Sequence, residues 1–212
     1  MNYLILAFIV ICIFILYQLN HVKEGIQNNA SNIVLLGDSI FQNKNYVPKH
    51  NSIEYLLKEK ITIPSLVLAE DNATIFNLYQ QYNKLPKSIN KSSTNLYISI
   101  GGNDLLNAYQ LSNINDYKLF NVIWNLYTKT IESLIQDTQC NIILTDIYYI
   151  TDSNYSKYLP IIEKWNSNLY LFAKQHDLDV FKISKILTIP SDFTHSIEPS
   201  VNGGKKLVNS FI

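Results

Sequence analysis

The sequence contains no arginine, so lysine supplies all 17 of its side chains of the Lys and Arg type. Asp and Glu also number 17, which leaves a formal net charge of zero at pH 7. Nucleic-acid-binding domains present a basic surface to phosphates, and arginine is the side chain that grips phosphate through two parallel hydrogen bonds. We therefore expect no nucleic-acid partner.

Cysteine is nearly absent as well, with only Cys12 and Cys140 in 212 residues. Cys12 lies inside an apolar N-terminal run, so a pair with Cys140 is not expected on geometric grounds. Two thiols without clustered histidines also offer no zinc site. The scarcity of cysteine thus excludes a disulfide framework, and no metal site is expected.

Charge is missing altogether from residues 3–19, where Gln18 is the one strongly polar side chain. An apolar helix of about 17 to 25 residues can span a bilayer. A cleaved signal peptide would begin with basic residues and end at a small-residue cleavage site, and this run has neither. Residues 1–20 are therefore expected to form a single-pass membrane anchor, or the protein to be secreted if this segment is cleaved. The polar residues 21–31 are expected to form a tether.

From residue 32 to residue 212, short β-rich runs alternate with amphipathic segments. The predicted strands are Ile33–Leu36, Ser65–Ala69, Leu96–Ile100, Asn141–Thr145 and Val180–Ile183. The predicted helices are Ile53–Lys60, Thr74–Tyr82, Tyr117–Gln136, Tyr158–His176 and Gly203–Ile212. Strands that are apolar throughout are typical of a sheet covered on both faces. The order predicts one doubly wound α/β domain with a mainly parallel sheet of about five strands.

Functional sites of such folds form where the parallel strands end. Three polar turns follow the first three predicted strands: Ser39, Asp71-Asn72, and Gly101 to Asp104. They are expected to converge on one edge of the sheet.

Ser39 lies in the stretch IVLLGDSIFQ, residues 33–42, and is either a helix cap or a nucleophile. A nucleophilic serine needs a base, and the base needs a group that fixes its tautomer. Of the four histidines, His195 lies three residues after Asp192, between Pro190 and Pro199. An Asp-x-x-His turn can place the carboxylate against Nδ1 of the imidazole and leave Nε2 for a hydroxyl.

The sequence resembles the SGNH, or GDSL, hydrolase family in three motifs taken together. They are Gly-Asp-Ser after the first strand, Gly-x-Asn-Asp after the third and Asp-x-x-His before the last helix. The resemblance runs from about Ile33 to the C-terminus and implies the flavodoxin-like SGNH fold. It implies Ser39 as nucleophile, His195 as general base and Asp192 as the residue that orients it.

The same resemblance implies an oxyanion hole made by the backbone N–H groups of Ser39 and Asn72 and the side-chain amide of Asn103. The family usually has glycine where this sequence has Asn72. Because the donor is a backbone group and asparagine tolerates positive φ, the oxyanion hole is expected to be kept.

The expected activity is hydrolysis of a carboxylic ester through an acyl-enzyme on Ser39, with no metal or organic cofactor. Candidate substrates are small acyl esters, lysophospholipids and O-acetylated glycans. Residues 105–116 and 147–158, read as loops, are expected to wall the pocket. The alternative is a membrane-tethered scaffold that has kept the fold without the activity.

Overall fold

The computed structural model describes residues 30–110, 112–113 and 116–211. The predicted membrane anchor, residues 1–20, and nearly all of the predicted tether lie outside these residues. Within the described part of the chain, no helix combines the length and the apolarity that crossing a bilayer requires.

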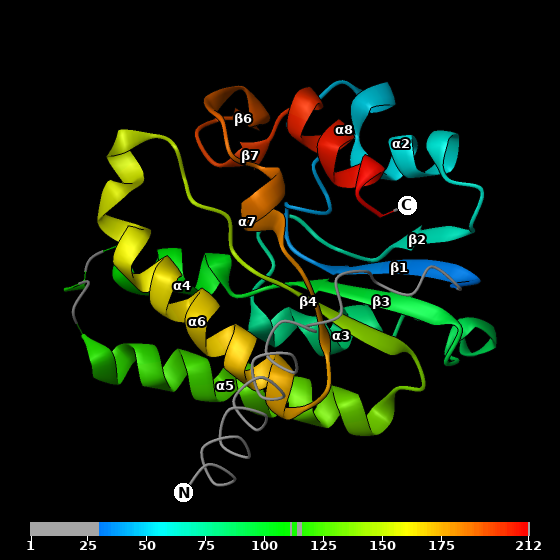
Figure 1. Cartoon of the computed structure of the whole chain (residues 1–212), viewed down its shortest axis with the longest axis horizontal. Helices are drawn as coiled ribbons and strands as arrows, with labels where there is room; N and C mark the ends of the chain where they lie inside the picture. Colours follow the sequence, from blue (N-terminus) through cyan, green and yellow to red (C-terminus); the bar gives the residue numbers. More distant parts are fainter. Residues whose placement is uncertain (1–29, 111, 114–115, 212) are drawn as a thin grey trace, which may run out of the picture.

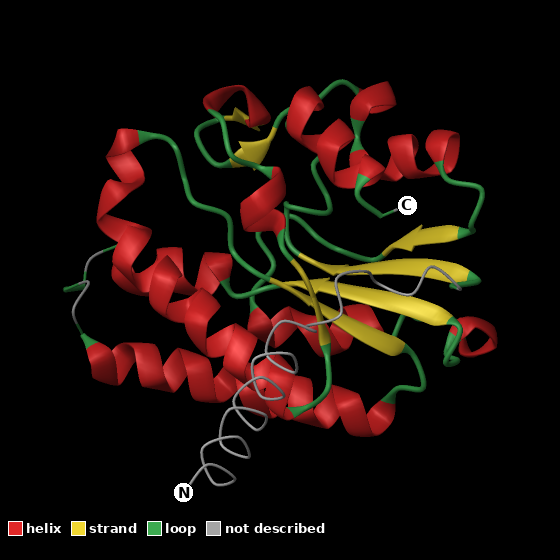
Figure 2. Ribbon diagram, in the orientation of Figure 1, coloured by secondary structure: helices red, strands yellow, loops and turns green. Residues whose placement is uncertain are grey.

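A five-stranded parallel sheet forms the centre of the molecule (Figure 2). Its strand order is β2-β1-β3-β4-β5, and every neighbouring pair is parallel. The strands are β1 (Asn32–Gly37), β2 (Ser65–Val67), β3 (Thr94–Ser99), β4 (Asn141–Thr145) and β5 (Asp179–Phe181). The prediction of an α/β domain with a parallel sheet of five strands is confirmed.

Helices cover both faces of this sheet (Figure 1). One face carries α2 (Ile53–Lys60) and α8 (Val201–Asn209). The other carries α3 (Leu78–Tyr82), α4 (Gly102–Tyr109), α5 (Tyr117–Asp137) and α6 (Leu159–Gln175). The central strands β1 and β3 are buried along their whole length, as their continuous apolarity predicts.

The longest helix, α5, agrees with the predicted span to within one residue. Asp116 caps it, because its carboxylate accepts hydrogen bonds from the backbone N–H groups of Lys118 and Leu119. Its buried side chains recur at helical spacing: Phe120, Ile123, Tyr127, Ile131 and Leu134.

Some boundaries differ from the sequence prediction. The sequence predicts a loop after β3, but Gly102 begins α4, and the polar residues Asn103 and Asp104 occupy its first turn. The segment Thr74–Tyr82 divides into a 3₁₀ turn and α3. The predicted fifth strand ends early because Ile183 already begins the short helix α7 (Ile183–Ile186).

The remaining short elements complete the connections. An antiparallel pair, β6 (Phe193–Thr194) and β7 (Glu198–Pro199), lies apart from the main sheet, between α7 and α8 in the chain. Short 3₁₀ turns occupy Lys49–Asn51, Ile75–Asn77, Lys87–Ile89, Ser153–Tyr158 and Pro190–Asp192.

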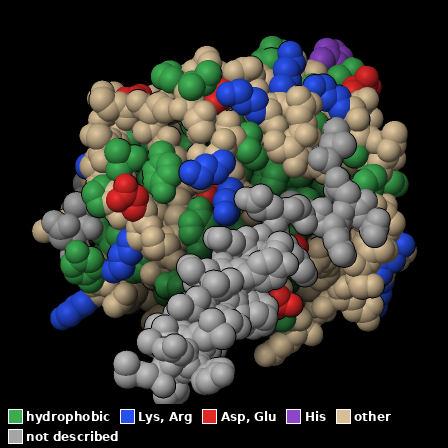
Figure 3. All heavy atoms as spheres, in the orientation of Figure 1, with side chains coloured by type: hydrophobic (Ala, Val, Ile, Leu, Met, Phe, Trp, Pro, Cys, Tyr) green, Lys and Arg blue, Asp and Glu red, His purple; other side chains and the backbone are tan. Residues whose placement is uncertain are grey.

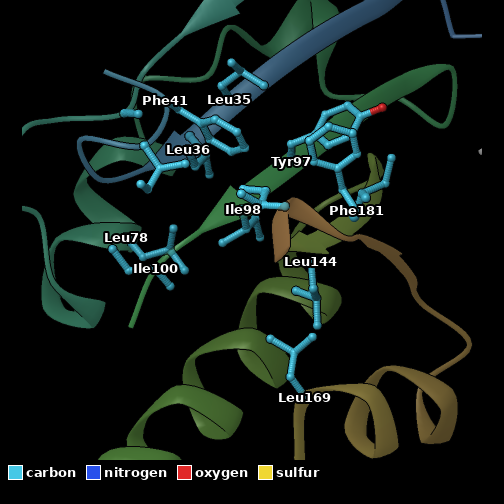
Figure 4. Packing of buried hydrophobic residues seen from close by; sticks show 14 of the residues in the cluster. Leu35, Leu36, Phe41, Leu78, Tyr97, Ile98, Ile100, Leu144, Leu169 and Phe181 are labelled. Atoms are coloured by element: carbon cyan, nitrogen blue, oxygen red, sulfur yellow. The ribbon is translucent and has the colours of Figure 1, made fainter. Parts of the chain in front are cut away.

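The hydrophobic core fills the space between the sheet and the helices (Figure 4). Leu144 on β4 and Leu169 on α6 point toward one another and are both fully buried. On the other side of the sheet, the ring of Tyr97 packs edge-on against Phe181, with centroids 5.4 Å apart. This packing holds the ends of β1, β3 and β4 in fixed positions, and the loops that follow them form the site described below.

Charged, polar and hydrophobic side chains are interspersed on the surface. On the face drawn in Figure 3, lysine side chains stand at several separate places among polar and hydrophobic ones. The most exposed large hydrophobic side chains are spread over several elements, with two of them, Tyr117 and Val122, on α5: Phe76, Tyr117, Val122, Tyr149, Leu171 and Ile189.

Candidate active site

Ser39 lies in the turn that leaves the carboxyl end of β1. The turn begins at Gly37, whose φ is +129°, a conformation that side chains rarely adopt. A Cβ at this position would lie 1.8 Å from the carbonyl oxygen of Ser99 on the neighbouring strand. Only glycine therefore allows β1 to approach β3 closely enough and to turn Ser39 out of the sheet.

A buried amide holds this turn from the other side. Gln81 on α3 is fully buried, and its Oε1 accepts a hydrogen bond of 2.7 Å from the backbone N–H of Gly37. Its Nε2 donates to the backbone oxygen of Gly37 at 2.8 Å. Gln81 thus satisfies the N–H of Gly37 and, together with the backbone N–H of Glu70, its carbonyl oxygen, which fixes the backbone just before Ser39.

Asp38 shapes the same turn. Its Oδ1 accepts hydrogen bonds from the backbone N–H of Ile40 at 3.1 Å and from the Ser99 hydroxyl at 3.2 Å. Burial raises the pKa of Asp38 to about 7, and the neighbouring carboxylate of Glu198 adds to the rise. Asp38 acts through the turn, by holding Ser39 at the mouth of the pocket described below.

Asn72 adopts the conformation that the family's glycine would supply, with φ at +58°. Two side chains from the start of α4 hold the backbone that follows it. The Asn103 Nδ2 donates to the oxygen of Ala73 at 3.0 Å, and the carboxylate of Asp104 accepts from the N–H of Ile75 at 3.1 Å. The predicted convergence of the turns after the second and third strands is therefore observed.

Asp192 lies far from solvent, with a fully buried side chain. Its Oδ2 accepts hydrogen bonds from the backbone N–H groups of Thr188 and Ile189, at 2.9 and 3.2 Å. Its Oδ1 accepts from Asn202, and the ammonium of Lys206 lies within 2.9 Å of both oxygens. Burial acts to raise the pKa of Asp192, but Lys206 and the two N–H groups outweigh it and hold the pKa below its usual value.

His195 lies at the surface, in a turn with φ at +47°. Its Nδ1 lies 3.5 Å from the hydroxyl of Thr194, and its ring packs 5.7 Å from that of Tyr46. Among the described residues, no hydrogen bond or ion pair joins His195 to Asp192 or to Ser39. In place of the expected contact with the imidazole, both carboxylate oxygens of Asp192 accept hydrogen bonds from Lys206, Asn202 and two backbone groups, so the triad stays a prediction.

Glu198 is the residue at the site that the sequence reasoning missed. It begins β7, three residues after His195, and its buried side chain lines the same pocket as Ser39. The sequence shows only that Glu198 directly precedes Pro199 and the Ser200 cap of the last helix. A glutamate in such a stretch is typical of a solvated surface residue, so the sequence alone does not predict its burial at the pocket.

A pocket opens beside Ser39 at the carboxyl edge of the sheet. Ser39, Asn103 and Glu198 supply polar groups to its wall. The apolar wall consists of Ile40, Ile100, Leu105, Leu106, Ile147, Tyr148, Ile150, Tyr158, Ile161, Ile162 and Ile197. The stretches 105–116 and 147–158 both contribute, as predicted, although the first begins on α4. Asn72, Asp192 and His195 do not line this pocket.

Within residues 30–110, 112–113 and 116–211, no group of three or more His, Cys, Asp or Glu side chains is placed to hold a metal ion.

Solved structures with the same fold come from several bacteria. A lipolytic protein of the G-D-S-L family from Veillonella parvula superposes with a TM-score of 0.67 at 18% identity, covering 84% of this chain and 94% of its own. An extracellular lipase from Streptomyces rimosus gives 0.60 at 16% identity, covering 86% and 100%. The acetylxylan esterase Axe2 from Geobacillus stearothermophilus gives 0.59 at 18%, covering 85% and 91%.

No curated protein matches the sequence. The family model of the GDSL-like lipases and acylhydrolases, however, matches residues 33–202, which span every element from β1 into α8. The chain therefore belongs to the GDSL-like lipase/acylhydrolase family, a family of hydrolases.

Proposed function

We propose that this GDSL-family chain is a serine ester hydrolase that forms an acyl-enzyme on Ser39. The observation that carries the proposal is the pocket at the end of β1, which Ser39 and Asn103 line together. A hydroxyl and an amide on one pocket wall can act on the same carbonyl group, one as nucleophile and the other as hydrogen-bond donor.

In the proposed reaction the Ser39 Oγ forms a bond to the ester carbonyl carbon while its proton passes to a base. The electron pair of the C=O bond moves onto the oxygen, where the backbone N–H groups of Ser39 and Asn72 and the Asn103 amide stabilise the charge. The Asn103 nitrogen carries two hydrogens and gives one to Ala73, so the other is free to donate. The alcohol then leaves with a proton, and water repeats the sequence to release the acid.

The identity of the base is a separate question. The triad of Ser39, Asp192 and His195 stays a prediction, and it would require Asp192 to exchange its contacts with Lys206 and Asn202 for the imidazole. The ester hydrolysis proposed here needs a base near Ser39, whichever residue supplies it.

The substrate class follows from the pocket wall. Isoleucine and leucine side chains dominate the wall, and they favour an apolar acyl chain over the hydroxyl-rich face of a sugar. We therefore propose lysophospholipids and small acyl esters ahead of O-acetylated glycans. Among structures of the same fold, one is described as a lipase and another as an acetylxylan esterase, so both chemistries belong in the test.

The test is a panel of aryl esters from acetate to decanoate, a lysophospholipid and an acetylated xylan. The full-length chain is assayed in a detergent that contains no ester bond. Turnover is expected to rise from acetate to the longer acyl groups and to disappear in Ser39→Ala. Turnover of any of these substrates that is undiminished in Ser39→Ala would refute the proposal. Ser31→Ala, at an exposed serine ahead of β1, is the matched control.

A second candidate function is a tethered binding or scaffold protein that retains the fold without turnover. The observation in its favour is that Asp192 and His195 are not joined. A serine-directed fluorophosphonate distinguishes the two, since a scaffold without an activated serine remains unlabelled at Ser39.

We also propose that residues 1–20 anchor the protein to a membrane as a single-pass segment. The uncharged apolar run of residues 3–19 supports this. The full-length chain is then expected to stay in the membrane fraction after a carbonate wash, whereas a chain that starts at residue 21 is released. Release of the full-length chain would contradict the proposal.

A further inference from the structure

Asp71 has no part in the reaction proposed above, yet both oxygens of its carboxylate accept hydrogen bonds. Its Oδ1 accepts one of 2.8 Å from the Tyr46 hydroxyl, and its Oδ2 accepts one of 3.0 Å from Asn45 Nδ2. Both donors belong to the segment that follows Ser39, whereas Asp71 directly precedes Asn72. Asp71 therefore joins the nucleophile segment to the loop that carries the proposed oxyanion N–H.

The Tyr46 hydroxyl is a lasting donor to this carboxylate. Burial raises the pKa of Tyr46 above its ordinary value of 10, and the hydrogen bond to Asp71 adds to the rise. The hydroxyl therefore keeps its proton at neutral pH and donates it to Asp71. An ionised carboxylate accepts on both oxygens and donates on neither, so it suits a position that binds two donors at once.

The loop around Asn72 is also attached at other points. The N–H of Glu70 donates to the carbonyl oxygen of Gly37 at 2.9 Å, which ties the start of the loop to the nucleophile turn. The first turn of α4 binds the end of the loop, as described above. Between these attachments, Asn72 has φ at +58°, a conformation that a residue with a Cβ keeps where its surroundings hold it. The Asn72 side chain is exposed, so its neighbours in the chain supply that hold.

We propose that Asp71 is a positioning residue that aims the backbone N–H of Asn72 at the oxyanion formed in the Ser39 reaction. The inference rests on the proposed function, because it presupposes attack by Ser39 on an acyl carbonyl. The N–H lies in the planar peptide unit that joins Asp71 to Asn72. Holding the Asp71 side chain therefore restricts the rotation of that unit. Asp71 contacts no reacting atom and acts through Asn72.

This role affects the transition state more than the binding of substrate. The carbonyl oxygen becomes fully negative only in the tetrahedral adduct, so an aimed N–H binds that adduct more strongly than the ester. Complete loss of one oxyanion donor lowers kcat by about 10²- to 10³-fold. Loss of Asp71 leaves the N–H in place with a poorer orientation, so we expect kcat to fall by about 10-fold and KM to stay within about two-fold.

The experiment measures kcat and KM of the full-length chain on the aryl ester that it turns over fastest. Asp71→Ala removes both acceptors and is expected to show the full loss. Asp71→Asn keeps one acceptor, and Asn45 can turn its amide to accept from the new N–H, so kcat is expected within about three-fold of the wild type. Tyr46→Phe removes one donor and is expected to fall between the two. Asp137→Ala is the matched control, because Asp137 likewise accepts a hydrogen bond from a tyrosine, Tyr79, at 2.9 Å.

A second readout reports the oxyanion directly. With an alkyl trifluoromethyl ketone, the Ser39 Oγ bonds to the carbonyl carbon, its proton passes to the base and the C=O electron pair moves onto the oxygen. The methyl ketone with the same alkyl chain resists this addition and reports binding of the uncharged carbonyl. Asp71→Ala is expected to weaken inhibition by the trifluoromethyl ketone about 10-fold and by the methyl ketone less than about two-fold. In an Asn72→Val background, Asp71→Ala is expected to lower kcat by less than about two-fold more, because both changes act through one N–H.

A wild-type kcat in Asp71→Ala overturns this inference and leaves the proposed function intact. Equal weakening of both ketones also overturns it, because Asp71 would then act on substrate binding. A fully additive loss in the Asn72→Val background contradicts action through that N–H. Should Asp71→Ala fail to fold, an unchanged kcat in Tyr46→Phe overturns the inference. A wild type that neither turns over esters nor is labelled at Ser39 refutes both the inference and the proposed function.

Discussion

The ammonium of Lys206 lies 2.8 Å from Oδ1 of Asp192, a carboxylate that is completely buried. This ion pair ties α8 to the 3₁₀ turn at Pro190–Asp192 and uses the carboxylate that the Asp-x-x-His spacing assigned to the imidazole. Asp192 therefore holds the last helix against the chain in this structure, and His195 remains at the surface without it.

The first prediction concerns this ion pair. Lys206→Met leaves the Asp192 carboxylate buried without its cation, and breaking a buried pair in this way typically costs about 3 to 5 kcal/mol. We expect the free energy of unfolding to fall by about 3 kcal/mol at pH 7. The expected loss is smaller near pH 4, because Asp192 in the variant can then become neutral. Urea denaturation at both pH values measures it.

Lys205→Met is the matched control, since Lys205 neighbours Lys206 on α8 but is exposed and forms no ion pair among the described residues. Equal destabilisation by the two variants would mean that the ion pair between Lys206 and Asp192 makes no specific contribution to the free energy of unfolding.

The second prediction concerns Asn72 at φ +58°. Glycine adopts this conformation freely, whereas a β-branched residue is strained there by about 1 to 3 kcal/mol. Asn72→Gly is expected to keep ester turnover within about two-fold, and Asn72→Val to lower kcat by at least ten-fold as the N–H turns away from the oxyanion. The Asn72 side chain itself is exposed, so its chemistry is not needed. Equal activity of the two variants would argue against a role for this N–H.

The third prediction uses the raised pKa of Glu198, about 7 in the folded protein against 4.5 as its ordinary value. The folded state binds more protons than the unfolded state between these values, so this group makes stability fall as the pH rises from about 4.5 to 7. Glu198→Gln removes that loss. Allowing for partial solvent screening, we expect it to add about 1 to 2 kcal/mol at pH 8, or roughly 2 to 8 °C in melting temperature.

At pH 4.5 the same variant is expected to have nearly the stability of the wild type. Thermal melts at pH 4.5 and pH 8 measure the difference, and a variant less stable than the wild type at pH 8 would contradict the account of Glu198 as an unpaired carboxylate.

The fourth prediction concerns the amide behind the nucleophile turn. Gln81→Leu leaves the N–H of Gly37 buried without a partner, at about 1 to 3 kcal/mol, whereas the carbonyl oxygen keeps its hydrogen bond from the N–H of Glu70. We expect the free energy of unfolding to fall by about 1 to 3 kcal/mol in urea denaturation, together with slower turnover because the turn before Ser39 loosens. Gln80→Leu, at the exposed neighbouring glutamine, should change little. Comparable losses of stability in both variants would show that the hydrogen bonds between Gln81 and Gly37 are not the cause of the destabilisation.

Much of the fold follows from local patterns in the sequence. The central strands are continuous apolar runs, and Gly37 marks the place where β1 must turn close to β3. The helices α2 and α5 carry their caps, Ser52 and Asp116, in the sequence. The sequence does not predict the start of α4, because Gly-Gly-Asn-Asp has the composition of a turn. The close approach of Gly101 to Trp165 just before this helix is a tertiary contact.

The sequence likewise predicts some features of the candidate site and not others. Ser39, Asn72 and Asn103 follow predicted strands, so the topology alone brings their turns to one edge. The surroundings of the two buried carboxylates do not follow from local spacing, because Asp192 pairs with Lys206 fourteen residues later and Glu198 lines the same pocket as Ser39, which is distant in the sequence. A charge that is buried by tertiary packing looks, in the sequence, like any surface glutamate.

The most direct test of the central claim, that Ser39 is the nucleophile, is peptide mass spectrometry of the fluorophosphonate-treated full-length chain. The account predicts one adduct, on Ser39, and no adduct in Ser39→Ala, with ester turnover lost in parallel. An adduct on another residue, or an unlabelled Ser39 in a chain that hydrolyses esters, would contradict it.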